Sequence, residues 1–163
     1  MPQPDGDGGS RPGPVEVRVD VVVQAPVEAV FAAFGQWSEQ GRWMLGTRVE
    51  VRSGDGAGVG SELAAWTGAG PAGFWDTMVI TRWEPPYRVD VLHTGSVVRG
   101  TGTMEVVALP GGRSRFIWSE LLDLPLGAVG RLGWPLARPT FRYGVKRSLT
   151  TFASFVEQGV LPR

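Results

Sequence analysis

The chain has 163 residues, with 16 basic and 16 acidic side chains and no cysteine. This length allows one domain with a substantial core, and the lack of cysteine excludes disulfides, thiolate metal sites and thiol nucleophiles. The balanced charge and the lack of a recognisable nucleic-acid-binding motif argue against nucleic-acid binding. No stretch is long and apolar enough to span a bilayer. We therefore expect a cytoplasmic protein without integral membrane association.

The first 14 residues contain four glycines and four prolines. Such a segment cannot repay the entropy of ordering, so residues 1–14 are predicted to be a disordered N-terminal tail. It has no apolar region of the kind found in a secretory signal. One folded domain is expected over residues 15–163.

The folded part is predicted to begin with a strand and one or two short helices. Valine occupies every second position from Val15 to Val23, which is typical of a strand with one buried face. Pro26 suits the first turn of a helix, and Gly35 suits its end. A second short helix or turn is expected from Trp37 to Trp43.

Six further extended segments follow, and their spacing favours an antiparallel meander. They are predicted at Arg48–Arg52, Val59–Trp66, Phe74–Trp83, Tyr87–Thr94, Val97–Leu109 and Arg113–Leu124. Pro85 and Pro86 mark one turn between them, because proline cannot donate to a strand ladder. A Gly/Pro loop is expected from Gly68 to Gly73.

A long amphipathic helix is predicted at the end of the chain. Apolar residues recur every three to four positions from Phe141 to Val156 and form one stripe that must be buried against the sheet. Pro135 and Pro139 are expected to break or kink any earlier helical turns, so the continuous helix is predicted to begin near Pro139.

Basic residues line one face of this predicted helix. Arg138, Arg142 and Lys146 recur every four positions. We interpret them as the solvated side of an amphipathic helix, and the alternative is a surface for an anionic membrane or nucleic acid.

Three runs of the sequence resemble the START-like superfamily, also called SRPBCC or the polyketide cyclase/dehydrase and lipid transport group. They are VRVDVVVQAPVEAVFAAFGQWSEQGRW, VITRWEPPYRVDV and VVALPGGRSRFIWSE. The resemblance covers about residues 15–160. It implies an α+β helix-grip (Bet v 1-like) fold, in which a seven-stranded antiparallel sheet with two short helices after its first strand wraps around the long C-terminal helix.

The resemblance also implies an apolar cavity between the sheet and the last helix. Members of the superfamily bind lipids, sterols, plant hormones, polyketide intermediates or quinones, and some bacterial members catalyse cyclisation or aromatisation of polyketides. The superfamily has no universal catalytic motif, so no catalytic role transfers to this chain residue by residue.

Alternation along the predicted strands selects two candidate acid/base residues. Glu120 shares a strand face with Phe116 and Trp118, and His93, the only histidine, shares one with Val89 and Val91. Each is either a ligand-orienting or proton-transferring group in the cavity, or a strand-end residue that contacts water. For Glu120 a structural salt bridge is a further alternative.

The strand from Val97 to Leu109 has glycines on the face that also holds Met104. Gly100 and Gly102 remove side chains there, which leaves room for a ligand or permits sharp curvature.

Other candidate ligand contacts come from aromatic residues and their neighbours. Trp66 and Trp118 are predicted to lie in the cavity wall with Met104, since both tryptophans are in the middle of strands. Asp76 can face either side of the sheet. Tyr143 can present its hydroxyl to the cavity, but the strand pattern does not determine its direction.

No cofactor and no metal site are expected, because one histidine and no cysteine leave only scattered carboxylates. The preferred function is non-catalytic binding of a small hydrophobic molecule, such as a lipid, a quinone or a polyketide-like compound. The protein is expected to be a monomer or homodimer. One alternative is a polyketide cyclase or dehydratase with Glu120 and His93 as acid and base. Another is a co-chaperone-like protein-interaction module of the same fold. The lack of a closely spaced acid/base pair in the sequence favours binding.

Overall fold

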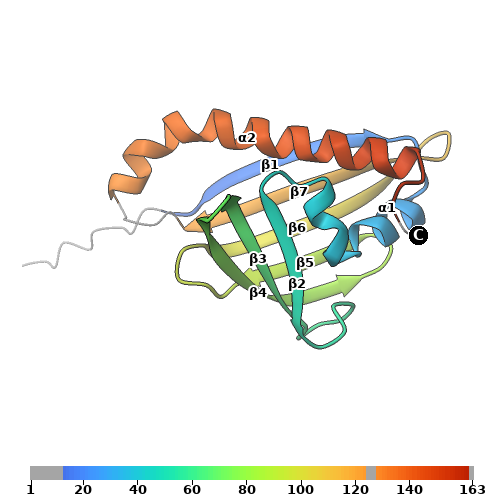
Figure 1. Cartoon of the computed structure of the whole chain (residues 1–163). Helices are drawn as coiled ribbons and strands as arrows, with labels where there is room; N and C mark the ends of the chain where they lie inside the picture. The colour runs from blue at the N-terminus through green and yellow to red at the C-terminus, as the bar shows by residue number, and fades with distance from the viewer. Residues whose placement is uncertain (1–12, 124–127, 162–163) are drawn as a thin grey trace, which may run out of the picture.

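The computed structural model describes residues 13–123 and 128–161. Seven strands and a long last helix, α2 (Ala128–Glu157), make up most of it (Figure 1). The strands are β1 (Val15–Val23), β2 (Thr47–Ser53), β3 (Glu62–Ala69), β4 (Ala72–Glu84), β5 (Arg88–His93), β6 (Arg99–Leu109) and β7 (Arg113–Asp123). Two short helices, α1 (Val27–Phe34) and the 3-10 helix η1 (Trp37–Arg42), follow β1.

The strands form one antiparallel sheet in the order β1-β7-β6-β5-β4-β3-β2. Every neighbouring pair after β1 is consecutive in the chain, and β1 closes the order by pairing with β7. The sheet curls, and α2 lies across its concave side (Figure 1). The predicted helix-grip architecture is therefore confirmed.

The core lies where α2 meets the sheet and the short helices. Phe152 of α2 is fully buried, and its ring centroid lies 4.8 Å from that of Trp43 and 5.0 Å from that of Phe116 in β7. Leu149, one turn earlier, is also fully buried. Residues of the predicted apolar stripe thus anchor the second half of α2, as their spacing indicated.

The start of α2 differs from the prediction. The helix begins at Ala128 and runs through both Pro135 and Pro139, although each proline removes a backbone donor. Side-chain packing connects the helical turns on either side of the prolines, since the ring centroid of Trp134, before Pro135, lies 5.9 Å from that of Phe141, after Pro139. Figure 1 shows the first turns of α2 bending away from the rest of the helix, as prolines commonly cause.

Two boundaries in the sheet also differ. The third strand starts at Glu62 rather than Val59, and β3 and β4 continue into the loop expected from Gly68 to Gly73. Gly68 and Gly73 pair across the two strands, so the turn narrows to two residues, and Gly70 adopts a φ of 57° there. The predicted N-terminal tail lies outside the described residues except for its last two.

Candidate functional site

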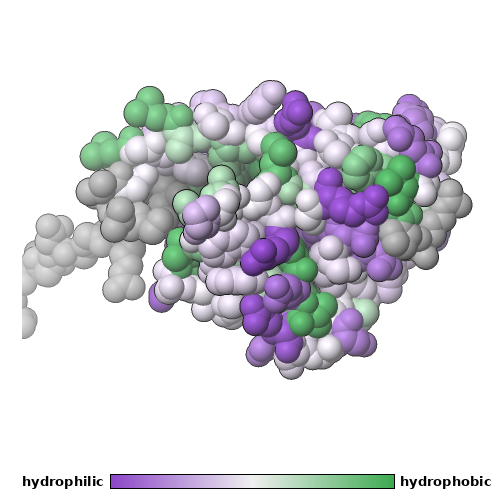
Figure 2. All heavy atoms as spheres, viewed as in Figure 1, coloured by the Kyte–Doolittle hydropathy of each residue, from purple (hydrophilic) through white to green (hydrophobic). Residues whose placement is uncertain are grey.

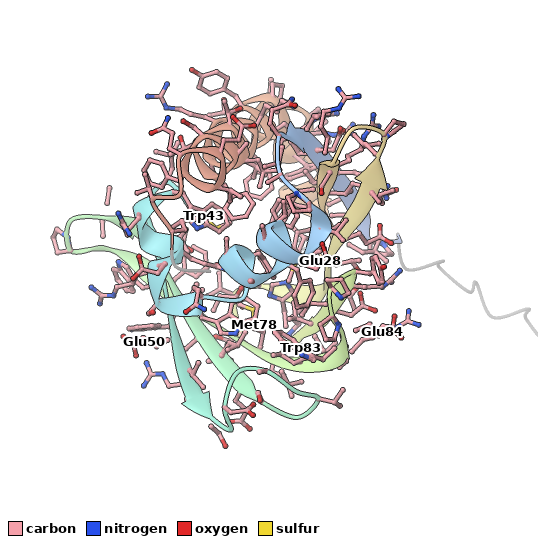
Figure 3. All side chains as sticks on the ribbon, turned by 90° about the vertical axis from the view of Figure 1, so that its right-hand side faces the viewer. Glu28, Trp43, Glu50, Met78, Trp83 and Glu84 are labelled. Carbon is pink, nitrogen blue, oxygen red and sulfur yellow. The ribbon has the colours of Figure 1, made fainter. Side chains whose placement is uncertain are left out.

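A cavity of about 370 Å³ lies between the concave face of the sheet and α2. Most of its wall is apolar, with Met78 and Val91 from the sheet and Phe141 and Val145 from α2. Figure 3 shows Met78 on the inner side of the sheet, with Trp43 closer to α2. The open side is beside Leu45, Thr140 and Phe141, since these lining residues are also exposed.

Three ionisable side chains meet in this apolar wall: Asp76 from β4, His93 from β5 and Glu120 from β7. His93 Nδ1 lies 2.8 Å from Asp76 Oδ2, and His93 Nε2 lies 2.8 Å from Glu120 Oε2. All three side chains are buried. We call this linked set the Asp–His–Glu cluster.

The strand between β5 and β7 makes the cluster possible. In the register of the sheet, His93 is opposite Gly100 and Glu120 is opposite Gly102, so β6 places no side chain between them. A Cβ on Gly102 would lie 2.9 Å from Glu120 Oε1 and 2.9 Å from a methyl carbon of Val91. The space at Gly102 is therefore used by the carboxylate of Glu120.

Gly100 has a different reason to be glycine. Its φ is 123°, and a Cβ there would lie 1.9 Å from the carbonyl oxygen of Leu121. The sequence predicted room for a ligand or sharp curvature at these glycines. The structure instead gives the room at Gly102 to Glu120, and a positive φ with close backbone approach accounts for Gly100.

The two carboxylates determine the protonation of His93. Burial alone would lower its pKa, but the hydrogen bonds to Asp76 and Glu120 and their negative charges raise it to about 10. At neutral pH His93 is therefore an imidazolium, and both ring N–H groups donate to carboxylate oxygens.

Glu120 also retains its proton more strongly than an exposed glutamate. Burial raises the pKa of Glu120, the hydrogen bond and charge of His93 oppose that rise, and the charge of Asp76 adds to it. The cluster thus holds an acid and a carboxyl group of raised pKa in direct contact beside an apolar cavity, which is an arrangement suited to proton transfer.

Asp76 contributes one further feature. Its Oδ1 atom is buried and accepts no hydrogen bond from any residue that the structure describes. A buried acceptor without a donor is costly, so a donor group supplied by a ligand would be stabilised at this position.

The structure places most of the predicted site residues at the cavity. Asp76, His93, Met104, Trp118 and Glu120 all line it. Asp76, whose direction the sequence left open, points inward. Ligand binding by these residues is a prediction.

Two predicted cavity residues lie elsewhere. Trp66 is on the outer face of the sheet, because its neighbours Ala65 and Thr67 line the cavity and strand side chains alternate. Its ring packs 5.8 Å from that of Trp75, and the guanidinium of Arg48 lies 5.7 Å from it. The prediction that Trp66 forms the cavity wall is therefore wrong.

Tyr143 is also outside the cavity. Its side chain is 65% exposed, because Phe141, Gly144 and Val145 occupy the helix face that turns toward the sheet. The expected hydroxyl contact with the cavity is absent, and Tyr143 instead lines a groove beside β1.

Sequence reasoning missed several polar lining residues. Gln40, Thr47, Thr67 and Ser148 contribute to the wall from η1, β2, β3 and α2. Strand alternation could have found two of them, since Thr47 shares a strand face with Val49, and Thr67 shares one with Ala65. No linear pattern marks Gln40 or Ser148.

Comparison with known proteins agrees with this architecture. Residues 14–157 match the model of the family described as polyketide cyclase / dehydrase and lipid transport. The chain belongs to this family. A comparison with curated protein sequences gave no match.

Solved structures of the same fold include TTHA0849 from Thermus thermophilus, at 17% identity over 89% of this chain and 99% of that one, with a TM-score of 0.75. The Zhui aromatase/cyclase from Streptomyces sp. R1128 is 14% identical over 90% of this chain and 95% of that one, with a TM-score of 0.72. BexL, a di-domain ARO/CYC from the BE-7585A biosynthetic pathway, is 17% identical over 88% of this chain and 50% of its own length, with a TM-score of 0.66. At these identities the likeness concerns the fold of the family.

None of the helices in the described part of the chain is long and apolar enough to cross a membrane.

Proposed function

We propose that this protein binds a small, largely apolar molecule with a polar oxygen group in the cavity between the sheet and α2. The observation that carries the proposal is the buried Asp–His–Glu cluster in an otherwise apolar wall. The apolar wall would hold the body of the ligand, and the cluster would orient its oxygen. The cavity volume of about 370 Å³ lies within the usual range of small-molecule sites, about 300–1,000 Å³.

A buried ionic cluster such as the Asp–His–Glu cluster stabilises a fold inefficiently. Burying charged groups costs desolvation energy that their attraction often only offsets, so replacing them with apolar residues is frequently neutral or stabilising. A buried ionic cluster that lines a cavity, and in which Asp76 Oδ1 has no donor among the described residues, is better explained by a ligand than by stability.

A second function, catalysis by proton transfer, is favoured by the contact between His93 and Glu120. In a dehydration, the carboxylate of Glu120 would remove a proton from the carbon next to a carbonyl of the substrate. The electrons released would expel a hydroxyl group from the β carbon, and the imidazolium of His93 would protonate that group so that it leaves as water. The aromatase/cyclases of the same fold support this class of reaction as the first to test.

Ligand-dependent thermal stability tests the binding proposal. Hydrophobic compounds with a carbonyl or hydroxyl group should raise the melting temperature, because a ligand at about 100 times its Kd stabilises the native state by about 2.7 kcal/mol. Met104→Trp, which places a larger side chain in the cavity, should reduce that rise. The matched control is Val107→Trp on the outer face of the same strand, where the rise should persist.

Glu120→Gln separates the two functions. If the site only binds, this variant should weaken affinity by roughly ten- to a hundredfold without any turnover to lose. If the site catalyses, turnover of a β-hydroxy carbonyl compound should fall much more than affinity does. A panel of lipids, quinones and aromatic polyketides that produces no stabilisation of the unmodified protein would contradict the binding proposal.

A further inference from the structure

The first half of α2 exposes apolar side chains on the face opposite the cavity. Leu132 is 80% exposed, Leu136 is 84% exposed and Tyr143 is 65% exposed. These residues are spaced by four and seven positions, so they form one stripe along the helix. Figure 2 shows hydrophobic residues at the surface where α2 begins.

A row of cations accompanies this stripe. Arg138, Arg142 and Lys146 lie between the exposed stripe and the buried face of α2. They line a groove together with Tyr143 and with Arg18 and Asp20 of β1. Neither Arg138 nor Arg142 forms an ion pair with any acid in the described residues. Lys146 donates to the backbone oxygen of Asp20, which anchors the row to the sheet.

Charge is distributed unevenly over the molecule. Five of the 16 basic side chains lie in α2, and the one acidic side chain of this helix is Glu157, its last residue. A chain with no net charge therefore carries one strongly cationic helix. The first half of α2 has exposed leucines beside a cationic row and no acidic residue, so it is complementary to a surface that is negatively charged with an apolar layer just below.

We propose that the first half of α2 docks on the surface of an anionic lipid bilayer, with the leucine stripe inserted at the headgroup level and the cationic row against lipid phosphates. The open side of the cavity, beside Thr140 and Phe141, is on the same half of the helix. The docking proposal depends only on this surface of α2. Movement of a lipid-soluble ligand between the bilayer and the cavity is a separate step, and it rests on the proposed function.

An aromatic series joins the docking surface to the cavity. The ring of Phe141 lies 5.9 Å from that of Trp134 and 6.2 Å from that of Trp118, which is in the cavity wall. Aromatic side chains therefore extend from the first half of α2 to the cavity wall.

Co-sedimentation with vesicles tests the docking. The full chain should bind vesicles of phosphatidylcholine mixed with phosphatidylglycerol, and much more weakly vesicles of phosphatidylcholine alone. Arg138→Gln with Arg142→Gln should weaken binding by roughly fivefold per cation removed. Leu132→Ser with Leu136→Ser should weaken it by at least about tenfold, since each leucine loses its buried apolar area.

Two control pairs match these changes elsewhere on the molecule. Arg52→Gln with Arg113→Gln removes the same charge from hairpin regions of the sheet, and Leu92→Ser with Leu121→Ser replaces two exposed leucines on its outer face. Both pairs should leave vesicle binding unchanged.

Three outcomes would overturn the proposal. They are equal binding to both kinds of vesicle, no binding to either, and a loss with the arginine pair but not with the leucine pair. The last outcome would identify the surface as a contact for acidic proteins or other polyanions. None of the substituted residues lines the cavity, so failure of docking would leave the proposed ligand function standing, and a protein that docks but binds no ligand would refute only that function.

Discussion

His93 is the only histidine of the chain, and both of its ring nitrogens lie 2.8 Å from a carboxylate oxygen. At the scale of single residues this contact determines the character of the site. The strands supply the three side chains, and Gly102 supplies the space in which Glu120 reaches His93. Because the three side chains are buried, water screens their charges only weakly, and the ionisation of each group depends strongly on the charge of its partner.

The pKa of His93 predicts a pH dependence of stability. The value is raised from 6.5 to about 10 on folding, so the folded state holds a proton that the unfolded chain releases between these values. The contribution of His93 to the free energy of unfolding should therefore be fully present below about pH 6.5 and be lost as the pH rises toward 10, by on the order of a few kcal/mol. Denaturant unfolding across this range measures the fall, and nitrogen NMR of the single imidazole measures the pKa directly.

His93→Gln is the control for that dependence. It removes the titrating group, so the decline between pH 6.5 and 10 should become shallower. The pKa of Glu120 is also raised on folding, so its contribution is likewise lost as the pH rises above its ordinary value of 4.5. That part should persist and grow in the variant, because His93 no longer opposes the rise. An NMR pKa of His93 near 6.5 would show that the cluster does not form in solution.

Gly102→Ala should disturb the cluster from the neighbouring strand. The added methyl group would press on Glu120 and Val91, so we expect a loss of about 1–3 kcal/mol in the free energy of unfolding and a lower pKa of His93. Gly133→Ala on α2 is the matched control, since nothing lies within 4 Å of a Cβ there. Equal stability of the two variants would mean that the space at Gly102 is not confined.

At the scale of elements, α2 has two halves with different roles. Its second half presents Leu149 and Phe152 to the core, and its first half presents Leu132 and Leu136 to solvent. Between the two halves, Phe141 and Val145 line the cavity on its α2 side. The prolines coincide with the half that packs least, where a lost helical hydrogen bond costs the core little.

Alanine substitutions should reveal this division. Phe152→Ala should lower the free energy of unfolding by about 3–5 kcal/mol, because its fully buried ring packs against Trp43 and Phe116. Leu136→Ala should change it by less than about 0.5 kcal/mol, since the side chain is 84% exposed. Urea unfolding monitored by tryptophan fluorescence gives both values, and comparable losses would contradict the division.

At the scale of the whole molecule, one curved sheet and one helix enclose the candidate site and also display the candidate docking surface. The sheet carries the ionisable cluster, and the helix carries the cations and the exposed leucines. The two features lie on opposite faces of α2, so a ligand in the cavity and a bilayer outside it would be separated by little more than one helix diameter, about 10–12 Å.

The sequence alone determined the order of elements and the faces of most strands. Val17, Val19 and Val23 are buried as the alternation in β1 predicts, and the stripe containing Leu149 and Phe152 is buried as its helical spacing predicts. These patterns are local, because side-chain direction in a strand or helix follows from the backbone repeat.

The site depended on tertiary structure. Asp76, His93 and Glu120 are 17 and 27 residues apart in the chain, and only the register of β4 to β7 brings them together. The sequence therefore showed no acid/base pair where the fold builds one. Trp66 was misplaced for another reason, since a position in the middle of a strand does not determine which face a side chain takes. Hydrophobic pattern specifies which elements form, whereas the hydrogen-bond register between distant strands decides which side chains meet in the cavity.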